Sequence, residues 1–345
     1  MIKYNFQVIK ANSNEWNDTL KKSHEFDFYH TEFYHSLEKD GTPIMLLVSS
    51  GEDFISLPLI IRNIQDSEYL DATSVYGYCG PIANKPIEAI DFDFLTFFKN
   101  EVLNYFKQEN IISVFSRLHP LIAQKNIFID FGDLVELNKT VSIDLTIPVD
   151  EQRRIYRKSL KSELNQLRRF GYTVEEPKDK FEIDAFIEIY NSTMDKLEAS
   201  EGYYFSNEYF HSFLKNKDFE SKLLLAKFEG VIVAGAIFTI VGGIMQYHLA
   251  GTKQEFIQKA PMKLILDEAR LLGTSLGLKY LHLGGGVGGE DTDSLFRFKT
   301  AFSKNFHQFS VWKMVVDKEK YQELVIKKAL NDSDSGFFPL YRLST

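Results

Sequence analysis

The feature that most limits the fold of this chain is an order of apolar and polar runs that occurs twice. Residues 204–218, YFSNEYFHSFLKNKD, repeat the pattern of residues 29–40, YHTEFYHSLEKD. In both halves two apolar runs follow, joined by a short polar turn that contains Gly51 or Gly230. Apolar runs on either side of a glycine turn predict an antiparallel hairpin. The repeat therefore predicts one α/β module that is used twice.

The elements after each hairpin also come in the same order, as a strand, a helix and a strand. The expected ranges are 72–78, 92–108 and 111–117 in the first half, and 244–250, 262–276 and 280–283 in the second. Pro261 and Gly277 flank the second helix at positions where proline and glycine are favoured. We therefore expect a mixed α/β fold, α+β in character, in which each module has a mostly antiparallel sheet flanked by helices.

The length of 345 residues suits about two domains. We expect a first module over 1–149, a connecting helix over 150–171 and a second module over 172–318. Residues 319–345 are predicted to form a C-terminal helix and a tail, to which the sequence assigns no role.

The connecting helix is the one basic stretch in an acidic chain. The whole chain has 40 Lys and Arg against 48 Asp and Glu, and this balance argues against a general nucleic-acid binder, so no DNA partner is expected. Arg153, Arg157 and Lys161 are spaced to share one helix face. A solvated linker and a phosphate-binding face both fit this pattern, and the contrast with the overall charge favours phosphate binding.

Several classes of protein and site are excluded or disfavoured by the residues that the chain lacks. The single cysteine, Cys79, excludes a disulfide framework and a zinc site built on several thiolates, and we expect it to be a buried hydrophobe. The eight histidines have no metal-ligand spacing, so no metal is expected. No apolar signal region is visible, and the longest apolar run, 231–245, is too short to span a bilayer. We therefore expect a cytoplasmic protein.

A glycine-rich segment follows the predicted strand 280–283. Residues 284–289, GGGVGG, match the spacing of a dinucleotide-binding loop, so a dinucleotide enzyme that uses Gly284–Gly289 remains an alternative. Acidic residues follow directly, and no second βαβ unit comes after the loop, which disfavours that alternative. We favour a flexible turn whose backbone passes close to a ligand or to another strand, with Gly285 and Gly286 as candidate binding residues.

Polar side chains near the ends of the predicted strands and helices are the remaining candidates. Arg297 and Lys299 flank a phenylalanine in a predicted helix over 294–304, either on its surface or as a cation pair facing a carbonyl oxyanion or a phosphate. Adjacent residues of a strand face opposite ways, so Tyr247 or His248 must face outward or into a cleft, and His248 is a candidate base. The candidates at strand ends in the first half are Tyr76, Tyr78, Arg117 and His119.

The predicted order of elements resembles the acetyltransferase fold of the GNAT superfamily. Two such modules in one chain resemble the FemAB family, the aminoacyl-tRNA-dependent transferases that build peptidoglycan side bridges. The motifs that carry the resemblance are YGYCGP, SRLHPL, VSIDLT with YRKSLKSELNQLRRFGYTV, FIEIYNSTMDKL, IMQYHLAGT, LHLGGG and DSLFRFK with AFS. They occur in order from about residue 25 to residue 316.

The resemblance implies an activated acyl or aminoacyl donor whose carbonyl is attacked by an amine of a cell-envelope precursor. Phe298-Lys299 resembles the Phe-Lys pair that serves catalysis or donor binding in the family. Lys196, three residues after Thr193, lies where the family places a basic residue for the acceptor's phosphates. Tyr247 resembles a tyrosine that contacts the acceptor.

We therefore expect an N-acyl or aminoacyl transferase of two modules, with a cleft between them for a nucleotide- or lipid-linked acceptor. Lys299 would stabilise the oxyanion or hold the donor, with Arg297 second, while Lys196, Tyr247 and Arg117 would shape the acceptor site. Residues 258–268, QKAPMKLILDE, lack the glycine-rich loop of acetyltransferases that bind CoA.

The donor therefore stays open between acyl-CoA and aminoacyl-tRNA, with no tightly bound cofactor. Charged tRNA is a candidate partner, and the protein could also contact a membrane peripherally. A non-catalytic protein that binds a saccharide precursor in the same cleft remains the main alternative.

Overall fold

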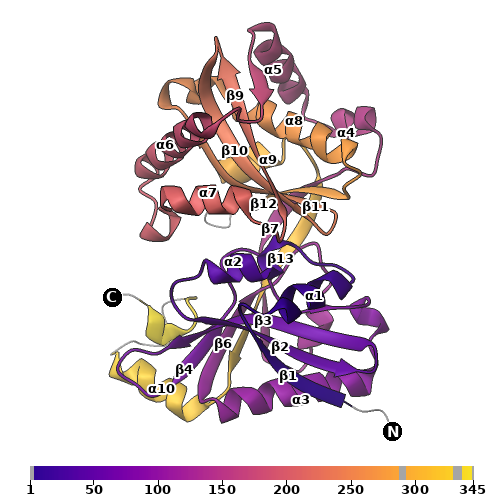
Figure 1. Cartoon of the computed structure of the whole chain (residues 1–345), viewed down its shortest axis with the longest axis vertical. Helices are drawn as coiled ribbons and strands as arrows, with labels where there is room; N and C mark the ends of the chain where they lie inside the picture. Colours follow the sequence, from indigo (N-terminus) through magenta and orange to yellow (C-terminus); the bar gives the residue numbers. More distant parts are fainter. Residues whose placement is uncertain (1–3, 287–292, 329–335, 344–345) are drawn as a thin grey trace. The chain divides into compact units, whose positions relative to one another are not determined.

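The computed structural model describes residues 4–286, 293–328 and 336–343 of the chain (Figure 1). Contacts within the chain divide it into two units. Unit 1 comprises residues 1–137 and 308–345, and unit 2 comprises residues 138–307.

Unit 1 has one mixed sheet. Its strands, in sheet order, are β1 (Tyr4–Lys10), β2 (Thr42–Ser50), β3 (Asp53–Asn63), β4 (Leu70–Thr73), β6 (Ile111–Arg117) and the part of β13 (Asn305–Val315) that belongs to this unit, with β5 (Ile82–Ala83) paired to β3. All neighbours are antiparallel except β4 and β6, which are parallel.

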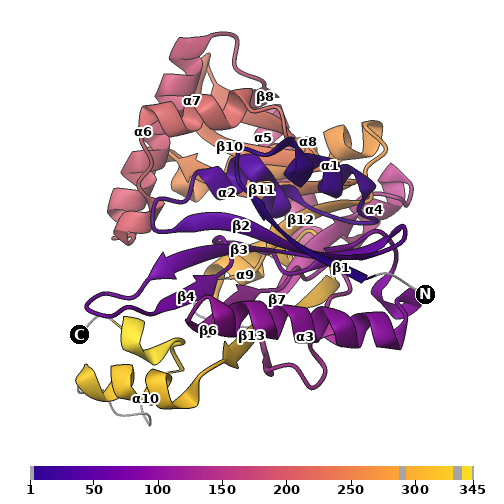
Figure 2. The ribbon, with the colours of Figure 1, turned by 60° about the horizontal axis from the view of Figure 1, so that its bottom comes forward.

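The helices of unit 1 cover this sheet. They are α1 (Asn14–Lys22), α2 (Glu32–Ser36), α3 (Phe92–Gln108) and α10 (Lys318–Lys327), with short 3-10 turns at η1 (Phe28–His30), η2 (Ile87–Ala89), η3 (Lys125–Phe128) and η6 (Leu340–Arg342). Asp91 caps α3 by accepting from the backbone N–H groups of its first turn. Phe94, Phe98, Val102 and Phe106 recur every four residues, so they form one buried stripe that packs α3 against the sheet (Figure 2).

Unit 2 repeats this sheet. Its strands, in sheet order, are β8 (Thr173–Glu175), β9 (Glu220–Phe228), β10 (Val231–Val241), β11 (Ile244–Thr252), β12 (Tyr280–Gly284) and the part of β7 (Asp133–Asp144) that belongs to this unit. Again only one neighbouring pair, β11 and β12, is parallel.

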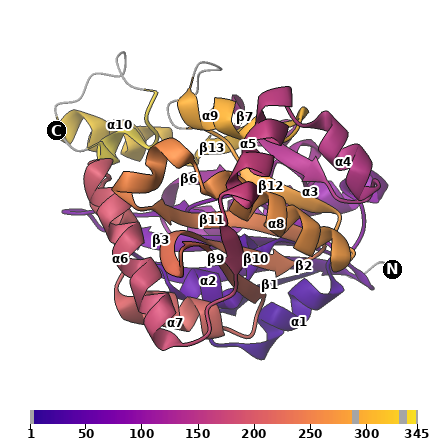
Figure 3. The same cartoon turned by 90° about the horizontal axis from the view of Figure 1, so that it is seen from above.

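The helices of unit 2 lie on both faces of its sheet (Figure 3). They are α4 (Val149–Ile155), α5 (Lys158–Arg169), α6 (Lys180–Lys196), α7 (Asn207–Lys215), α8 (Met262–Ser275) and α9 (Ser294–Lys299), with 3-10 turns at η4 (Glu201–Tyr203) and η5 (Gln254–Lys259). Helix α6 approaches β10 so closely that a Cβ added at Gly235 would lie 2.5 Å from the ring of Phe186.

The two units exchange their last strands. β7 follows β6 along the chain, yet it pairs with β12 of unit 2. β13 follows β12 with α9 between them, yet it pairs with β6 of unit 1. The two units therefore have the same strand order. Their boundaries differ from the predicted division of the chain into 1–149, 150–171, 172–318 and 319–345. The connecting segment belongs to unit 2 and the tail to unit 1, because strand pairing joins segments that are distant in sequence.

The predicted connecting helix over 151–170 is wrong as a single helix. Two helices, α4 and α5, replace it, and the chain is extended at Tyr156 and Arg157, where ψ is 140° at both residues. The hydroxyl of Tyr156 donates to the buried carboxylate of Asp267 at 2.8 Å, and the Arg157 N–H donates to the Ala301 carbonyl at 2.9 Å. These contacts break the helix, so Arg153, Arg157 and Lys161 do not follow one continuous helical face.

Asp267 on α8 holds both new helices. Burial alone would raise the pKa of this carboxyl, but the hydrogen bond from Arg168 on α5 and the charge of Arg270 outweigh burial and lower the pKa. Arg153 on α4 lies 3.5 Å from the same carboxylate. The ion pairs therefore give part of the basic segment a structural role in fixing α4 and α5 to α8.

No helix in the described ranges, 4–286, 293–328 and 336–343, is both long enough and apolar enough to cross a membrane. The other predicted elements are present; the helix over 92–108 and the strand over 111–117 have the predicted ends, and the ends of the rest are shifted. The strand expected over 72–78 is β4 and stops at Thr73, and the helix expected over 294–304 is α9 and stops at Lys299.

Candidate functional site

The parallel ladder between β11 and β12 is short. It pairs Ile244 with Tyr280 and ends where Gln246 pairs with His282. β11 continues beyond the ladder with Tyr247, while β12 continues toward Gly284. Beyond the last pair of this ladder, the backbone groups of β11 and β12 that face each other no longer pair, so a side chain can reach them. The charged side chain of Lys299, at the end of α9, lies there.

Lys299 lies at the place where this ladder ends. Its ammonium group donates to the carbonyl of Gly285, just after β12, at 2.5 Å, and lies 5.8 Å from the ring centre of Tyr247 on β11. Only 6% of the side chain is exposed. Burial lowers the pKa of Lys299 to about 7, although the charge of Asp293 acts in the opposite direction. At neutral pH the amine therefore exchanges readily between its charged and neutral forms.

The segment that carries Gly285 and Gly286 is fitted closely to the start of α9. Asp293 caps this helix by accepting from the Phe296 N–H at 2.7 Å. A Cβ at Gly286 would lie 2.6 Å from an oxygen of the Asp293 carboxylate. Gly286 thus allows the backbone to pass beside the helix cap.

The two cations predicted as a pair on α9 have different environments. Lys299 is buried, whereas Arg297, two residues earlier on the helix, is exposed. Helix geometry places residues two apart on different sides, so the cation pair that we expected does not form.

His248 lies next to Tyr247 on β11 but has a different environment. Its ring stacks on Phe213 with centres 5.0 Å apart. Burial lowers the pKa of His248 to about 3, and an imidazole of such low pKa accepts protons poorly. Burial also raises the pKa of Tyr247, so its phenol stays protonated.

The remaining candidates of unit 2 are at its surface. Lys196, on the last turn of α6, is exposed. Arg157 donates to the hydroxyl of Ser159 and Lys161 to the carbonyl of Arg154, both at the solvent-exposed side of α4 and α5.

The dinucleotide alternative finds no support in the topology. Residues 287–289 of the glycine segment lie outside the described residues. The strand that follows, β13, pairs with β6 and does not lie beside β12 in a parallel βαβ unit, as a dinucleotide fold requires.

In unit 1 the structure brings Tyr76 and Arg117 together. The guanidinium of Arg117, at the end of β6, lies 5.3 Å from the ring centre of Tyr76 and 5.1 Å from that of Phe115. The Tyr76 side chain is 58% exposed, and its backbone carbonyl accepts from the Tyr34 hydroxyl at 3.0 Å. A guanidinium held between two rings is preorganised to bind an anion.

Tyr78, which is half-buried, contacts the buried His119 in the same unit. The ring of Tyr78 meets His119 edge-on at 6.2 Å. His119 Nε2 lies 3.0 Å from a carboxylate oxygen of Asp27, and both side chains are fully buried. The Gln124 side chain accepts from the His119 N–H and donates to the carbonyl of Cys79. His119 thus anchors the loop that carries the two tyrosines.

Cys79 in the same loop is buried, and burial raises the pKa of its thiol to about 12, as expected for a hydrophobe. Among the described residues no group of three or more His, Cys, Asp and Glu side chains is arranged to hold a metal ion.

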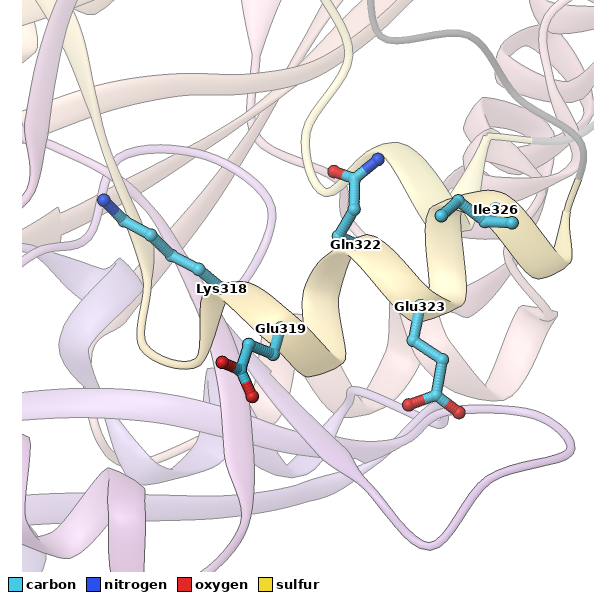
Figure 4. Close-up of a pocket in the computed structure, with 5 residues that line it drawn as sticks. All are labelled: Lys318, Glu319, Gln322, Glu323 and Ile326. Carbon is cyan, nitrogen blue, oxygen red and sulfur yellow. The ribbon is translucent and has the colours of Figure 1, made fainter.

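One hollow lies on the outer side of α10, where side chains spread along the helix (Figure 4). It is lined by Lys318, Glu319, Gln322, Glu323 and Ile326. No candidate residue lines this hollow, so we assign it no part in the site.

The sequence analysis did not single out Asp293, Lys313 or Phe338. Lys313 interrupts the apolar residues of β13, and a lone cation in such a strand is a signal that could have identified it.

Comparisons with known proteins come from structure alone. Neither a family model nor the sequence of a curated protein matches the chain. The structure of FemX is similar with a TM-score of 0.69 at 12% identity, covering 92% of this chain and 99% of FemX. L-PGS from Bacillus licheniformis has a TM-score of 0.60 at 15% identity, covering 93% and 98%.

The C-terminal domain of a predicted lysylphosphatidylglycerol synthetase from Agrobacterium fabrum has a TM-score of 0.53 at 14% identity, covering 80% and 84%. At these identities the similarity concerns the fold. The chain has the fold of FemX and L-PGS, which agrees with the FemAB-like fold that the resemblance predicted.

Proposed function

We propose that this protein is a transferase that moves an acyl or aminoacyl group from an activated donor to an amine of a cell-envelope precursor. The observation that carries the proposal is the buried ammonium of Lys299 at the end of the β11–β12 ladder. The fold shared with FemX and L-PGS supports it.

The proposed reaction needs one bond formed and one broken. The neutral amine of the acceptor attacks the donor carbonyl carbon, a C–N bond forms, and the carbonyl oxygen becomes an oxyanion. The ammonium of Lys299, which now donates to Gly285, would donate to that oxyanion in a site of low dielectric constant. When the C–O or C–S bond breaks, the leaving group takes the electron pair, and the proton lost by the amine passes to it through water.

Each unit contributes candidate residues for acceptor binding. We assign Arg117 and Tyr76 of unit 1, and Lys196 and Tyr247 of unit 2, to acceptor binding. The exposed cations Arg157 and Lys161 would bind phosphates of the donor, while Arg153 serves the Asp267 network. His248 is not retained as a base because of its low pKa.

The donor is proposed to be either acyl-CoA or aminoacyl-tRNA, each used as a co-substrate. Both are available in the cytoplasm, where we place the reaction. A lipid-linked acceptor would require a peripheral contact with the membrane.

The proposal is tested by transfer assays with the purified protein. Labelled acetyl-CoA and a mixture of labelled aminoacyl-tRNAs are each incubated with a nucleotide-linked muramyl peptide, and product is measured by mass. Lys299→Met should lower kcat by about a hundredfold or more, as the loss of an oxyanion donor does in other enzymes. Lys304→Met, at an exposed lysine nearby in sequence, is the matched control and should leave kcat unchanged.

Equal rates for wild type and Lys299→Met would refute the assigned role of Lys299. Binding of the muramyl peptide without transfer from either donor would favour the non-catalytic alternative instead.

A further inference from the structure

The C-terminal segment, residues 336–343, is held firmly against the sheet of unit 1. The Tyr341 hydroxyl lies 2.6 Å from the Ser113 hydroxyl and donates to the buried Asp71 carboxylate at 3.1 Å. Arg342 also donates to this carboxylate through Nε, and its Nη2 donates to the Asn63 carbonyl at 2.8 Å. Buried ionic hydrogen bonds of this kind fix a segment in one position.

A second set of contacts fixes the orientation of Phe338 within this segment. The Leu340 N–H donates to the Tyr321 hydroxyl on α10 at 2.9 Å. The ring of Tyr321 stacks on Phe338 with centres 5.9 Å apart and planes 17° apart. Phe338 is thus supported from the side of α10.

On its other side Phe338 meets the residues at the end of β6. Its ring centre lies 6.4 Å from that of Phe115, and the ammonium of Lys313 lies 5.7 Å from the Phe338 ring centre. Lys313 pairs with Phe115 in the β13–β6 register, so the two side chains share one face of the sheet. Arg117, two residues beyond Phe115, is on the same face.

Three rings and two cations therefore form one line of contacts in unit 1. We call this line the aromatic–cation row, and its members are Tyr76, Arg117, Phe115, Phe338 and Lys313. The carboxylate of Asp71 beneath the segment accepts hydrogen bonds from Arg62, Tyr341 and Arg342.

We infer that the C-terminal segment completes the acceptor site: Arg117 and Lys313 bind the diphosphate of the acceptor, and Phe338 holds Lys313 in position. This inference rests on the proposed function, because it assigns the row to that acceptor. Guanidinium and ammonium groups bind diphosphate oxygens, with Arg117 suited to two parallel hydrogen bonds. The rings of Phe115 and Phe338 contact these cations and restrict where their charged groups can lie.

The first experiment measures binding by calorimetry with UDP-N-acetylglucosamine, UDP, N-acetylglucosamine and geranyl diphosphate as separate probes. Diphosphate probes should bind wild type, and affinity should fall as salt rises. Arg117→Met should weaken binding about tenfold or more, and Phe338→Leu and Lys313→Met about fivefold each. Phe337→Ala, at the exposed neighbouring ring, is the control and should stay within about twofold of wild type.

Tighter binding of the nucleotide probes than of geranyl diphosphate would assign a nucleotide-linked acceptor, and the reverse order a lipid-linked one. Equal affinities of Phe338→Leu, Phe337→Ala and wild type, with unchanged melting temperatures, would overturn the inference. Binding of no diphosphate probe by wild type would overturn it as well.

A transfer assay separates failure of this inference from failure of the proposed function. If Lys299-dependent transfer occurs while Phe338→Leu leaves the acceptor KM unchanged, the inference fails and the transferase stands. If no donor supports transfer, the proposed function fails, and the effect of Phe338→Leu on binding still decides whether the row binds diphosphates.

Discussion

Replacing Lys299 with methionine should stabilise the fold while removing the proposed activity. The structure holds an amine with a pKa of about 7 at a site that is only 6% exposed, whereas the same amine in the unfolded chain has its ordinary value of 10.5. The unfolded state therefore binds more protons between these two values, and the free energy of unfolding of the wild type rises with pH across this window.

The size of the effect follows from the difference of about 3.5 pKa units at about 1.4 kcal/mol per unit. Near pH 7 the buried lysine costs the fold about 4 kcal/mol, and near pH 9.5 the cost falls to about 1–2 kcal/mol. Methionine has a similar length and no charge, so Lys299→Met removes this cost but also loses the hydrogen bond to Gly285, worth about 1 kcal/mol.

The assay is urea unfolding of wild type and variant at pH 7 and at pH 9.5. We expect Lys299→Met to be more stable by about 3 kcal/mol at pH 7, with the advantage shrinking to less than 1 kcal/mol at pH 9.5. The exposed Lys304→Met should show no such pH dependence. If the difference in free energy of unfolding between Lys299→Met and wild type is the same at both pH values, the reasoning is refuted. That result would mean that the fold does not lower the pKa of the Lys299 amine.

Three further substitutions test the structural networks. Asp267→Asn leaves the buried guanidinium of Arg270 without its counter-charge and should lower the free energy of unfolding by about 3–5 kcal/mol in urea titrations. Gly77→Ala should cost more than about 2 kcal/mol, because φ is +119° and the new Cβ would lie 2.0 Å from the ring of Tyr29; thermal melting will measure this. Tyr341→Phe removes the hydroxyl that joins the C-terminal segment to the sheet and should increase proteolytic cleavage of that segment, with an expected loss of about 1–2 kcal/mol.

Local patterns in the sequence predict most of the elements. The helix over 92–108 has the expected ends because Asp91 caps it and its apolar residues recur with helical spacing. The strand 111–117 is likewise present at its predicted ends. The repeat predicts that both modules share one order of elements, and the common strand order of the two units bears this out.

Contacts between distant residues explain what the sequence could not predict. No Gly or Pro marks the break between α4 and α5, since it depends on Tyr156 reaching Asp267 more than a hundred residues away. The burial of Lys299 depends on the ladder between β11 and β12 ending where it does. The position of Phe338 depends on contacts that the C-terminal segment makes with distant residues, and the sequence of this segment shows neither helical nor strand periodicity. Such features arise from tertiary structure and leave no local signal.

The exchange of β7 and β13 sets the order in which the chain can complete its two sheets during synthesis. Unit 1 has nearly all its strands once β6 is made, but its last strand follows residues 138–307. At ordinary translation rates the ribosome needs roughly ten to thirty seconds to make that segment. Throughout this time β6 would present an unpaired strand edge, a hazard for aggregation. The nascent chain therefore needs protection of β6, and unit 2, which receives β7 before its other strands, is the unit that can finish first.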